Sequence, residues 1–227
     1  MSRAHRINLG GLDLIPDMSG ALYVPDFSAL IAADLHFEKG SSLAKRGVHL
    51  PPYDTRETLG QLEAAIAQVS PKRLILLGDS FHDRHARERI AGDDVARLVA
   101  LTSRIDIVWI TGNHDPLPPR DLGGTIAEEI ALGPLSLRHE PSRLAEEEYE
   151  IAGHLHPAAA LSQRGRQLRC RCFAGDGRRL VMPAFGAFTG GLDVRDEAFM
   201  PVFPTGEFFV WMIGSRAIHR FPSSRVR

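Results

Sequence analysis

Aspartate, asparagine and histidine side chains follow five apolar segments of the chain, and these residue types can bind metal ions or transfer protons. One case is Gly112-Asn113-His114-Asp115, which follows the apolar run 105–110. Alone, this tetrapeptide fits a simple turn as well as it fits a site. The candidate ligands are Asp34, His36, Asp79, Asn113, His139, His154 and His156. A histidine buried in the core explains any single member, but it is a poor explanation for the whole set.

All of these side chains offer oxygen or nitrogen, and none offers a thiolate. Structural zinc sites are usually tetrahedral and often contain cysteine, whereas a larger set of oxygen and nitrogen donors suits two divalent ions. Manganese is the first expectation, and iron or zinc are the alternatives. Two ions about 3.5–4 Å apart share ligands, and a carboxylate can bridge them. The alternating Cys170 and Cys172 are interpreted as buried apolar residues of a strand.

The apolar segments that precede the candidate ligands predict buried strands. Residues 29–33, 74–77 and 105–110 alternate with predicted helices over 54–69 and 87–102. This order favours parallel strands joined by right-handed crossovers. Asp54 is expected to be the N-cap of the first helix, with Glu57 completing a capping box.

Beyond residue 115, glycine and proline separate short apolar runs, which predicts a second, largely antiparallel sheet. The expected strands are 125–131, 135–138, 149–152, 167–173, 180–183, 208–213 and 216–220. Residues two apart on a strand face the same side, so Asp34 and His36 are expected to converge, as are His154 and His156. Without a repeat or a linker, residues 1–227 are interpreted as a single domain.

Composition restricts the class of protein. The chain has 27 lysines and arginines against 28 acidic residues, and its formal net charge of -1 excludes a strongly basic nucleic-acid scavenger but not a local basic surface. No apolar run reaches the roughly 20 residues of a membrane span. The N-terminus is not followed by the apolar core of a signal peptide, so no membrane association and a cytoplasmic location are expected.

Taken in order, the ligand motifs resemble those of the calcineurin-like metallophosphoesterases. The matching motifs are Asp34-Leu35-His36, Gly78-Asp79, Gly112-Asn113-His114-Asp115, His139 and Gly153-His154-Leu155-His156. The resemblance implies an α/β fold, a four-layer α/β/β/α sandwich of two mixed sheets flanked by helices. It also implies hydrolysis of phosphodiesters by a hydroxide shared between two metal ions.

The same resemblance implies a role for each residue. Asp34, His36 and His156 would hold one ion. Asn113, His139 and His154 would hold the other, and Asp79 would bridge the two. His114 would be the general acid that protonates the leaving group.

The segment Gly78-Asp79-Ser80-Phe81-His82 departs from the superfamily's phosphatases and is similar to the Gly-Asp-x-Phe-His motif of SbcD-type nucleases. His82 is therefore a candidate second catalytic imidazole; the alternative is that it only orients a neighbour. Segments 34–42, 50–55 and 78–83 resemble the ligase-associated DNA-damage-response endonucleases of the PdeM type. This narrower resemblance implies a DNA substrate in DNA repair, with a DNA ligase and a helicase as functional neighbours.

Four basic residues near the ligand motifs are the expected contacts to the DNA backbone: Lys39, Lys45, Arg46 and Arg84. The arginines of 164–179 and 216–227 either contact phosphates or form ordinary solvated surfaces. The glycine-rich segment 185–191 either shapes a groove wall or packs two phenylalanines into the core. Two other functions stay open: hydrolysis of a small nucleotide, cyclic phosphodiester or pyrophosphate, and a metal-bound scaffold in a repair complex with little turnover.

Overall fold

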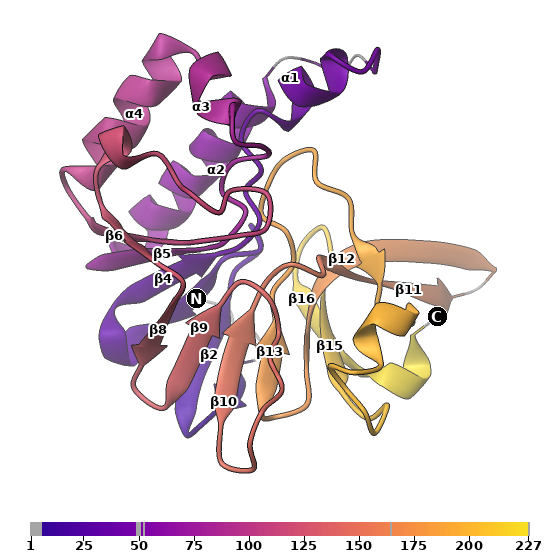
Figure 1. Cartoon of the computed structure of the whole chain (residues 1–227). Helices are drawn as coiled ribbons and strands as arrows, with labels where there is room; N and C mark the ends of the chain where they lie inside the picture. Colours follow the sequence, from indigo (N-terminus) through magenta and orange to yellow (C-terminus); the bar gives the residue numbers. More distant parts are fainter. Residues whose placement is uncertain (1–5, 49–50, 52, 164, 227) are drawn as a thin grey trace.

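The computed structural model describes residues 6–48, 51, 53–163 and 165–226. Two β-sheets pack against each other, and the α-helices gather on the outer face of the first sheet (Figure 1). The first sheet has seven strands, in the order β1 (Ile7–Leu9), β2 (Leu12–Pro16), β3 (Leu22–Val24), β4 (Ala29–Ala32), β5 (Arg73–Leu77), β6 (Asp106–Ile110) and β7 (Thr125–Ala127). The helices are α1 (Lys39–Ala44), α2 (Asp54–Val69), α3 (Ala86–Arg89) and α4 (Gly92–Thr102).

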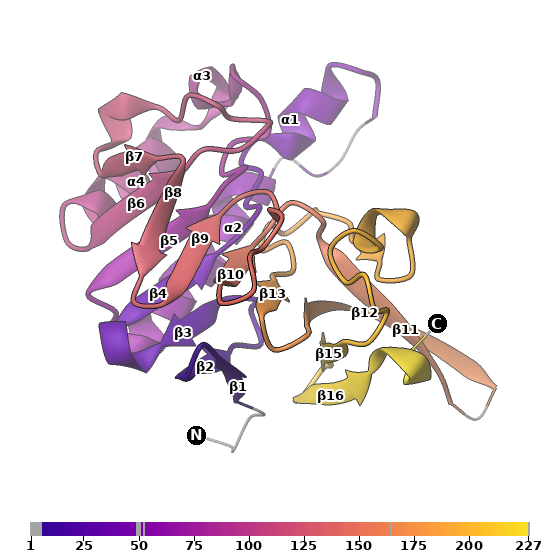
Figure 2. The same cartoon turned by 60° about the horizontal axis from the view of Figure 1, so that its bottom comes forward.

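The second sheet has nine strands, and β12 joins its two parts. The main path runs β14 (Leu192–Asp193), β11 (Pro157–Gln163), β12 (Arg166–Gly175), β13 (Arg179–Val181), β10 (Tyr149–Ala152), β9 (Leu135–Arg138) and β8 (Glu129–Leu132), while β15 (Phe209–Ile213) and β16 (Ile218–Pro222) extend from β12. Most strand pairings of this sheet are antiparallel, as predicted. The sheet is nevertheless mixed, because β10 pairs in parallel with both β9 and β13. The long β11–β12 hairpin projects from the body in both views (Figure 2).

The strands β4, β5 and β6 are apolar on both faces because both faces are covered. Ile31 and Ile75 lie in the core between the sheets, whereas Leu30 and Leu74 pack against the helices. Parallel strands buried in this way read as continuous apolar runs, which is why they were predictable. Their parallel register brings the carboxyl ends of β4, β5 and β6 to one edge of the sheet.

The outer face of the second sheet is covered by segment 194–208 and two short 3-10 helices. Phe199 and Phe203 of this segment pack on Cys172 and Val210. The 3-10 helices of the chain are η1 (Pro25–Phe27), η2 (Arg120–Leu122), η3 (Glu197–Phe199) and η4 (Ser223–Arg225). The expected sandwich of two mixed sheets with flanking layers is thereby confirmed, with short 3-10 turns in place of long helices on this side.

Several predicted boundaries were wrong. The helix predicted over 87–102 is broken at Ile90, whose extended ψ of 129° ends α3 two residues before α4 begins. The strand predicted over 125–131 is divided at Glu128, because β7 pairs with β6 in one sheet and β8 pairs with β9 in the other. Strand β11 was not predicted. Among the described helices, none has the length and apolar character that a membrane span requires.

The predicted capping box of α2 was also wrong. Tyr53 occupies the N-cap position, and no side chain caps the helix. The carboxylate of Asp54 instead accepts a hydrogen bond from the backbone N–H of Gly40, 2.9 Å away. The cysteines are free, as predicted, but only Cys172 is buried, while Cys170 is half-buried.

Candidate metal centre

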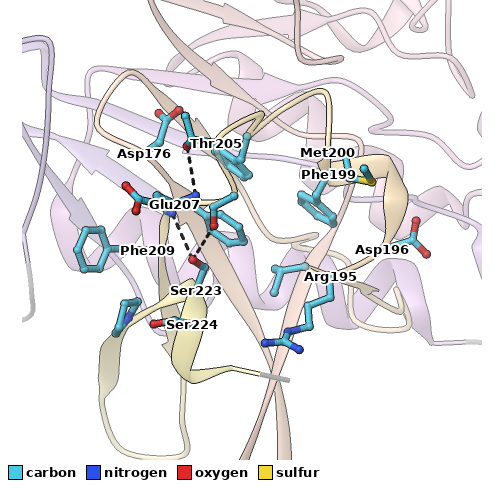
Figure 3. Close-up of a pocket in the computed structure, with 15 residues that line it drawn as sticks. Asp176, Arg195, Asp196, Phe199, Met200, Thr205, Glu207, Phe209, Ser223 and Ser224 are labelled. Carbon is cyan, nitrogen blue, oxygen red and sulfur yellow. Dashed lines mark hydrogen bonds between the residues drawn. The ribbon is translucent and has the colours of Figure 1, made fainter.

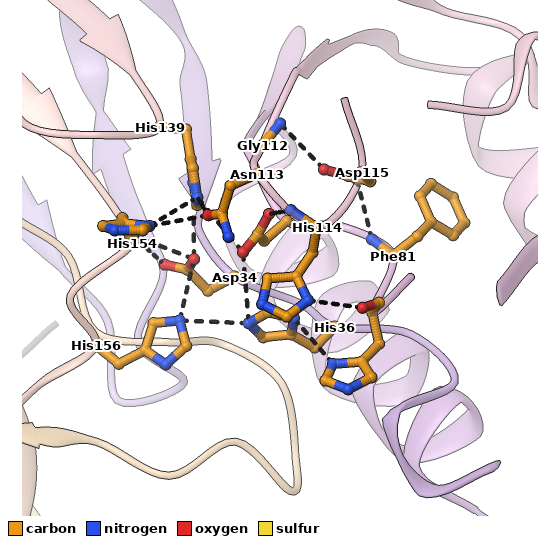
Figure 4. A network of polar contacts seen from close by, with 12 residues as sticks. Asp34, His36, Phe81, Gly112, Asn113, His114, Asp115, His139, His154 and His156 are labelled. Atoms are coloured by element: carbon orange, nitrogen blue, oxygen red, sulfur yellow. Dashed lines mark hydrogen bonds and ion pairs between the residues drawn. The ribbon is translucent and has the colours of Figure 1, made fainter. Parts of the chain in front are cut away.

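The seven candidate ligands lie together in the structure, although they come from five separate segments (Figure 4). In a first group, Nε2 of His156 is 3.1 Å from Oδ1 of Asp34 and 3.3 Å from Nε2 of His36. Asp34 and His36 are almost completely buried. Three donors from the ends of β4 and β10 therefore face one point.

A second group forms beside the first. Oδ1 of Asn113 is 2.9 Å from Nε2 of His139 and 3.0 Å from Nδ1 of His154, and the two histidine nitrogens are 3.2 Å apart. Asp79 lies between the groups, because its Oδ2 is 3.4 Å from Nε2 of His139 and 3.9 Å from Nε2 of His36. A single carboxylate thus faces both sets of donors.

The convergence of Asp34 with His36, and of His154 with His156, does not come from strand pleating as predicted. All four residues follow the strand ends and have positive φ values, 56°, 49°, 69° and 46° in that order. Backbone hydrogen bonds hold these turns: the N–H of His36 donates to the carbonyl of Asp79, and that of His154 donates to the Asp34 carboxylate. Left-handed backbone at several non-glycine residues is costly, and such strain concentrates at functional sites.

Glycines in the motifs leave room for the ligands. A Cβ at Gly78 would lie 2.2 Å from Nδ1 of His139, and one at Gly112 would lie 2.1 Å from Oδ1 of Asp79. Both distances are too short for any side chain. The glycines of these motifs therefore allow close approach of the backbone to a ligand.

We expect Gly112→Ala to weaken metal binding by about 10-fold or more, because the new methyl group would displace the carboxylate of Asp79. Gly92→Ala is the matched control, since a Cβ at Gly92 meets nothing within 4 Å. Metal content after dialysis against graded metal concentrations, with circular dichroism as a check on folding, measures the effect. Equal metal retention by the two variants would contradict the steric argument.

The protonation of the site follows from burial and neighbouring charges. Burial, followed by repulsion from His156, lowers the pKa of His36 to about 2. Burial raises the pKa of Asp79, but hydrogen bonding and attraction to His139 outweigh it and bring the value to about 2. Burial lowers the pKa of His139, and its contact with Asp79 reverses this to about 9. His139 would therefore have to lose a proton on binding a cation.

The donor set fits divalent metal ions. Ligand bonds of about 2.0–2.2 Å place neighbouring ligand atoms roughly 3 Å apart, and the donor separations of 2.9–3.4 Å in the two groups match this spacing. Nitrogen and oxygen lone pairs that converge at such distances repel each other unless a proton or a cation lies between them. The residues present can accordingly hold divalent metal ions, with Asp79 facing both donor groups.

His114 and His82 lie beside the first group. Nδ1 of His114 donates a hydrogen bond to the backbone carbonyl of His82 at 2.8 Å, and the two rings stack at 5.1 Å. Nδ1 of His82 is 3.5 Å from Nδ1 of His36. Burial, and then repulsion from His114, lowers the pKa of His82 to about 4. With Nδ1 engaged, Nε2 is the nitrogen of His114 that can transfer a proton.

Sequence reasoning assigned no role to Asp115, which is buried and holds two motifs together. Its carboxylate accepts hydrogen bonds from the backbone N–H groups of Gly112 and Phe81, each at 3.1 Å (Figure 4). Burial raises its pKa to about 7. The acidic residue at the end of the Gly-Asn-His-Asp motif was the available signal, but nothing in the sequence indicated its partners.

Three of the four predicted DNA contacts, Lys39, Lys45 and Arg46, lie in or directly after helix α1, which stands out from the body (Figure 1). Lys39 is half-buried, whereas Lys45, Arg46 and Arg84 are exposed. The charge of Arg46 is close enough to lower the pKa of His82, after the larger effects of burial and of His114. Lys39 therefore lies beside the metal centre, where it lines a cavity with His154 and His156, whereas Lys45, Arg46 and Arg84 lie on the surface.

A polar network anchors α1. The buried carboxylate of Glu38 accepts hydrogen bonds from Thr55 and Ser41, at 2.8 and 2.6 Å. Arg89 donates to Ser41 and forms a bidentate ion pair with Asp83. This network was not predicted, because its members are individually ordinary polar residues. It holds α1 next to the loop that carries His82.

The arginine-rich stretch 164–179 is mostly engaged in internal contacts. Arg179 forms a buried ion pair with Glu150, and Arg171 donates to the carbonyl of Ala184. Arg169 donates to the carbonyl of Gly191 at 2.5 Å. Arg164 lies outside the described residues. The interpretation of this stretch as a phosphate-contacting surface therefore receives no support from the arginines whose contacts are described.

A cavity of about 810 Å³ lies away from the candidate ligands, on the outer side of the second sheet (Figure 3). Phe199, Met200 and Phe209 line it together with Arg195 and Glu207. None of the candidate ligands borders this cavity. Size alone is therefore a poor guide to the site in this chain, since the converging polar groups are at the edge of the first sheet.

Two of three comparisons with known proteins found matches to this chain. The family model described as calcineurin-like phosphoesterase matches residues 27–176. The crystal structure of a nuclease, MPE, from Pseudomonas putida is 29% identical, with a TM-score of 0.75, and the match covers 96% of this chain and 100% of that chain. The phosphoesterase Yfce from E. coli is 15% identical, with a TM-score of 0.45 over 85% of this chain and 97% of that chain. No curated protein matches the chain.

Proposed function

Because the chain belongs to the calcineurin-like phosphoesterase family, we propose that it is a dinuclear metal-dependent phosphodiesterase that cleaves DNA. The observation that carries the proposal is the meeting of two donor groups at Asp79. The 29% identity to a Pseudomonas putida nuclease over nearly the whole chain supports a nucleic acid as the substrate. Metal-dependent phosphoester hydrolysis is the activity of the family. What we propose beyond it is that the substrate is DNA and that the centre holds two metal ions.

In this proposal Asp34, His36 and His156 hold one ion, while Asn113, His139 and His154 hold the other. Asp79 contributes to both. Manganese is the preferred ion, and iron or zinc would also suit a set of imidazole, amide and carboxylate ligands. When bound, a pair of such ions activates water near neutral pH and stabilises negative charge on phosphoryl oxygens.

His114 is proposed as the general acid. The carbonyl of His82 accepts the Nδ1 proton of His114, so the neutral imidazole left after proton transfer is held in one tautomer. In the protonated imidazolium, Nε2–H is the group that gives its proton to the departing alkoxide. The backbone N–H of His114 donates to Oδ1 of Asp79 at 2.8 Å, which fixes the imidazole relative to the donor groups.

His82 is proposed to act with His114. Its carbonyl positions the acid, and its ring contacts both His114 and the Nδ1 atom of His36. A metal-binding histidine usually donates its other N–H to a fixed partner, and Nδ1 of His82 is placed to accept from His36. A direct catalytic role for His82 and this orienting role both remain predictions.

The wider biological setting also remains a prediction. A role in DNA repair, a DNA ligase and a helicase as functional neighbours, a cytoplasmic location and a single domain over residues 1–227 follow from the sequence and its resemblances alone. The exposed Lys45, Arg46 and Arg84 are the proposed contacts to DNA outside the centre, and each would be sensitive to salt.

A substrate panel tests the proposal. Protein loaded with manganese should hydrolyse bis-p-nitrophenyl phosphate and labelled single-stranded DNA but not p-nitrophenyl phosphate, and chelation should abolish both activities. Diester hydrolysis without DNA cleavage would favour a small phosphodiester or pyrophosphate instead. Full metal occupancy without turnover would favour a scaffold. Unchanged activity after exhaustive chelation would contradict a metal-dependent mechanism.

A further inference from the structure

A second cavity, of about 450 Å³, adjoins the metal centre. Lys39 lines one part of it, and the backbone of Gly190 and Gly191 lines another. His154 and His156, one from each donor group, also border the cavity. The cavity therefore adjoins both donor groups of the candidate metal centre.

Lys39 brings to this cavity a positive charge that has no direct ion-pair partner among the described residues. The side chain is half-buried, and no carboxylate of the described residues lies within ion-pair distance of it. Burial lowers its pKa, which attraction to Asp34 and Asp54 opposes. A partly desolvated ammonium group without a direct partner is unfavourable unless an anion binds beside it.

The glycine-rich segment adds backbone hydrogen-bond donors to the lining of the same cavity. In the described part of the chain, the backbone N–H groups of Gly190 and Gly191 have no acceptor. The next peptide is held at both ends, because Arg169 donates to the carbonyl of Gly191 at 2.5 Å and the N–H of Leu192 donates to the carbonyl of His156 at 2.9 Å. A Cβ at Gly191 would lie 2.8 Å from both the His156 carbonyl and Ala158, so glycine is required.

A half-buried ammonium and backbone N–H groups without an acceptor, when they line one cavity, can together bind an oxyanion. We infer that this cavity binds a second phosphate of the substrate, adjacent to the phosphodiester that is cleaved. The inference rests on the proposed function and narrows it, because an isolated phosphodiester would leave the cavity without its anion. The preferred substrate would be an oligonucleotide or polynucleotide with neighbouring phosphates.

Chromogenic nucleotides that differ by one phosphate test the inference. The substrates are thymidine 5′-(p-nitrophenyl phosphate) with and without a 3′-phosphate, and thymidine 3′-(p-nitrophenyl phosphate) with and without a 5′-phosphate. For one of these pairs, the added phosphate should raise kcat/KM of the manganese-loaded protein by about 10- to 100-fold, the range for charge-assisted hydrogen bonds. The gain should shrink as the ionic strength rises.

Lys39→Met should remove most of this gain, and Lys72→Met should preserve it. Lys72 is exposed and precedes β5, at the opposite end of the strand from the metal centre. Each gain is the kcat/KM of one variant with the added phosphate divided by its kcat/KM without it. An effect of the substitution on the chemical step changes both values equally and therefore cancels. A wild-type gain below twofold for both pairs, or a full gain in Lys39→Met, would overturn the second phosphate site while leaving diester hydrolysis intact. No turnover of any of the four substrates would overturn the inference together with the proposed function.

Discussion

Replacing His114 with alanine should lower the rate of DNA cleavage by about 10²- to 10⁴-fold, the usual contribution of a general acid. Metal content should not change, because neither of the donor groups includes the His114 side chain. The imidazole is exposed and is held through Nδ1 by the carbonyl of His82, so its removal leaves no buried polar group unpaired. Single-turnover cleavage of labelled DNA, together with elemental analysis of the protein, measures both quantities.

The leaving group supplies a sharper control for the same variant. A p-nitrophenolate group departs without protonation, so His114→Ala should lose much less activity on bis-p-nitrophenyl phosphate than on DNA. His85→Ala is the matched control, since His85 is an exposed histidine whose imidazole pairs with Glu88, outside the donor groups. Equal losses on both substrates would contradict proton donation, and loss of metal would mean that His114 acts as a ligand.

Asp79→Asn should remove the binding of both ions and lower turnover by more than about 100-fold. Removing a residue that only hydrogen-bonds to a metal ligand costs about 10- to 100-fold, and loss of a ligand should cost more. The amide retains the shape of the carboxylate but not its charge. It would also direct either an N–H group or a neutral oxygen toward His139 and His36, which face Oδ2 of Asp79 at 3.4 and 3.9 Å. Bound metal per chain, measured during titration with manganese, is the primary readout.

A comparison of variants isolates the shared role of Asp79. His156→Ala removes a donor from the first group only, so one ion per chain should remain, whereas Asp79→Asn should retain neither. Asp106→Asn is the control, because Asp106 is an exposed aspartate at the start of β6 that pairs with Arg73. One tightly bound ion in Asp79→Asn would show that this carboxylate serves a single site.

Much of the framework was predictable because it depends on local pattern. The runs that became β4, β5 and β6 are apolar on both faces, and they alternate with helical segments, which is typical of parallel strands under two layers. Pattern failed where long-range contacts decide the structure. Asp54 had the residue type of an N-cap, but its carboxylate bonds to Gly40 in the neighbouring loop. Residues 125–131 looked like one strand, but they divide between two sheets.

The candidate site shows the same division. Residue type and motif order identified Asp34, Asp79 and the histidines as a set, because carboxylates and imidazoles at the ends of buried strands are chemically unusual. The predicted route to convergence was wrong, since left-handed turns rather than strand pleating direct Asp34 and His36. Such turns depend on backbone hydrogen bonds between segments far apart in sequence, as between His36 and Asp79.

The amino-acid sequence by itself determined the chemical character of this protein: oxygen and nitrogen ligands in a recognisable order, carried on strands that must be buried. Only the tertiary structure decided how these donors meet: left-handed turns direct them, Oδ2 of Asp79 faces both His139 and His36, and Lys39 lines one cavity with Gly190 and Gly191. The reason is physical. Residue type is a local property, whereas distance and desolvation arise when segments more than a hundred residues apart pack at one sheet edge.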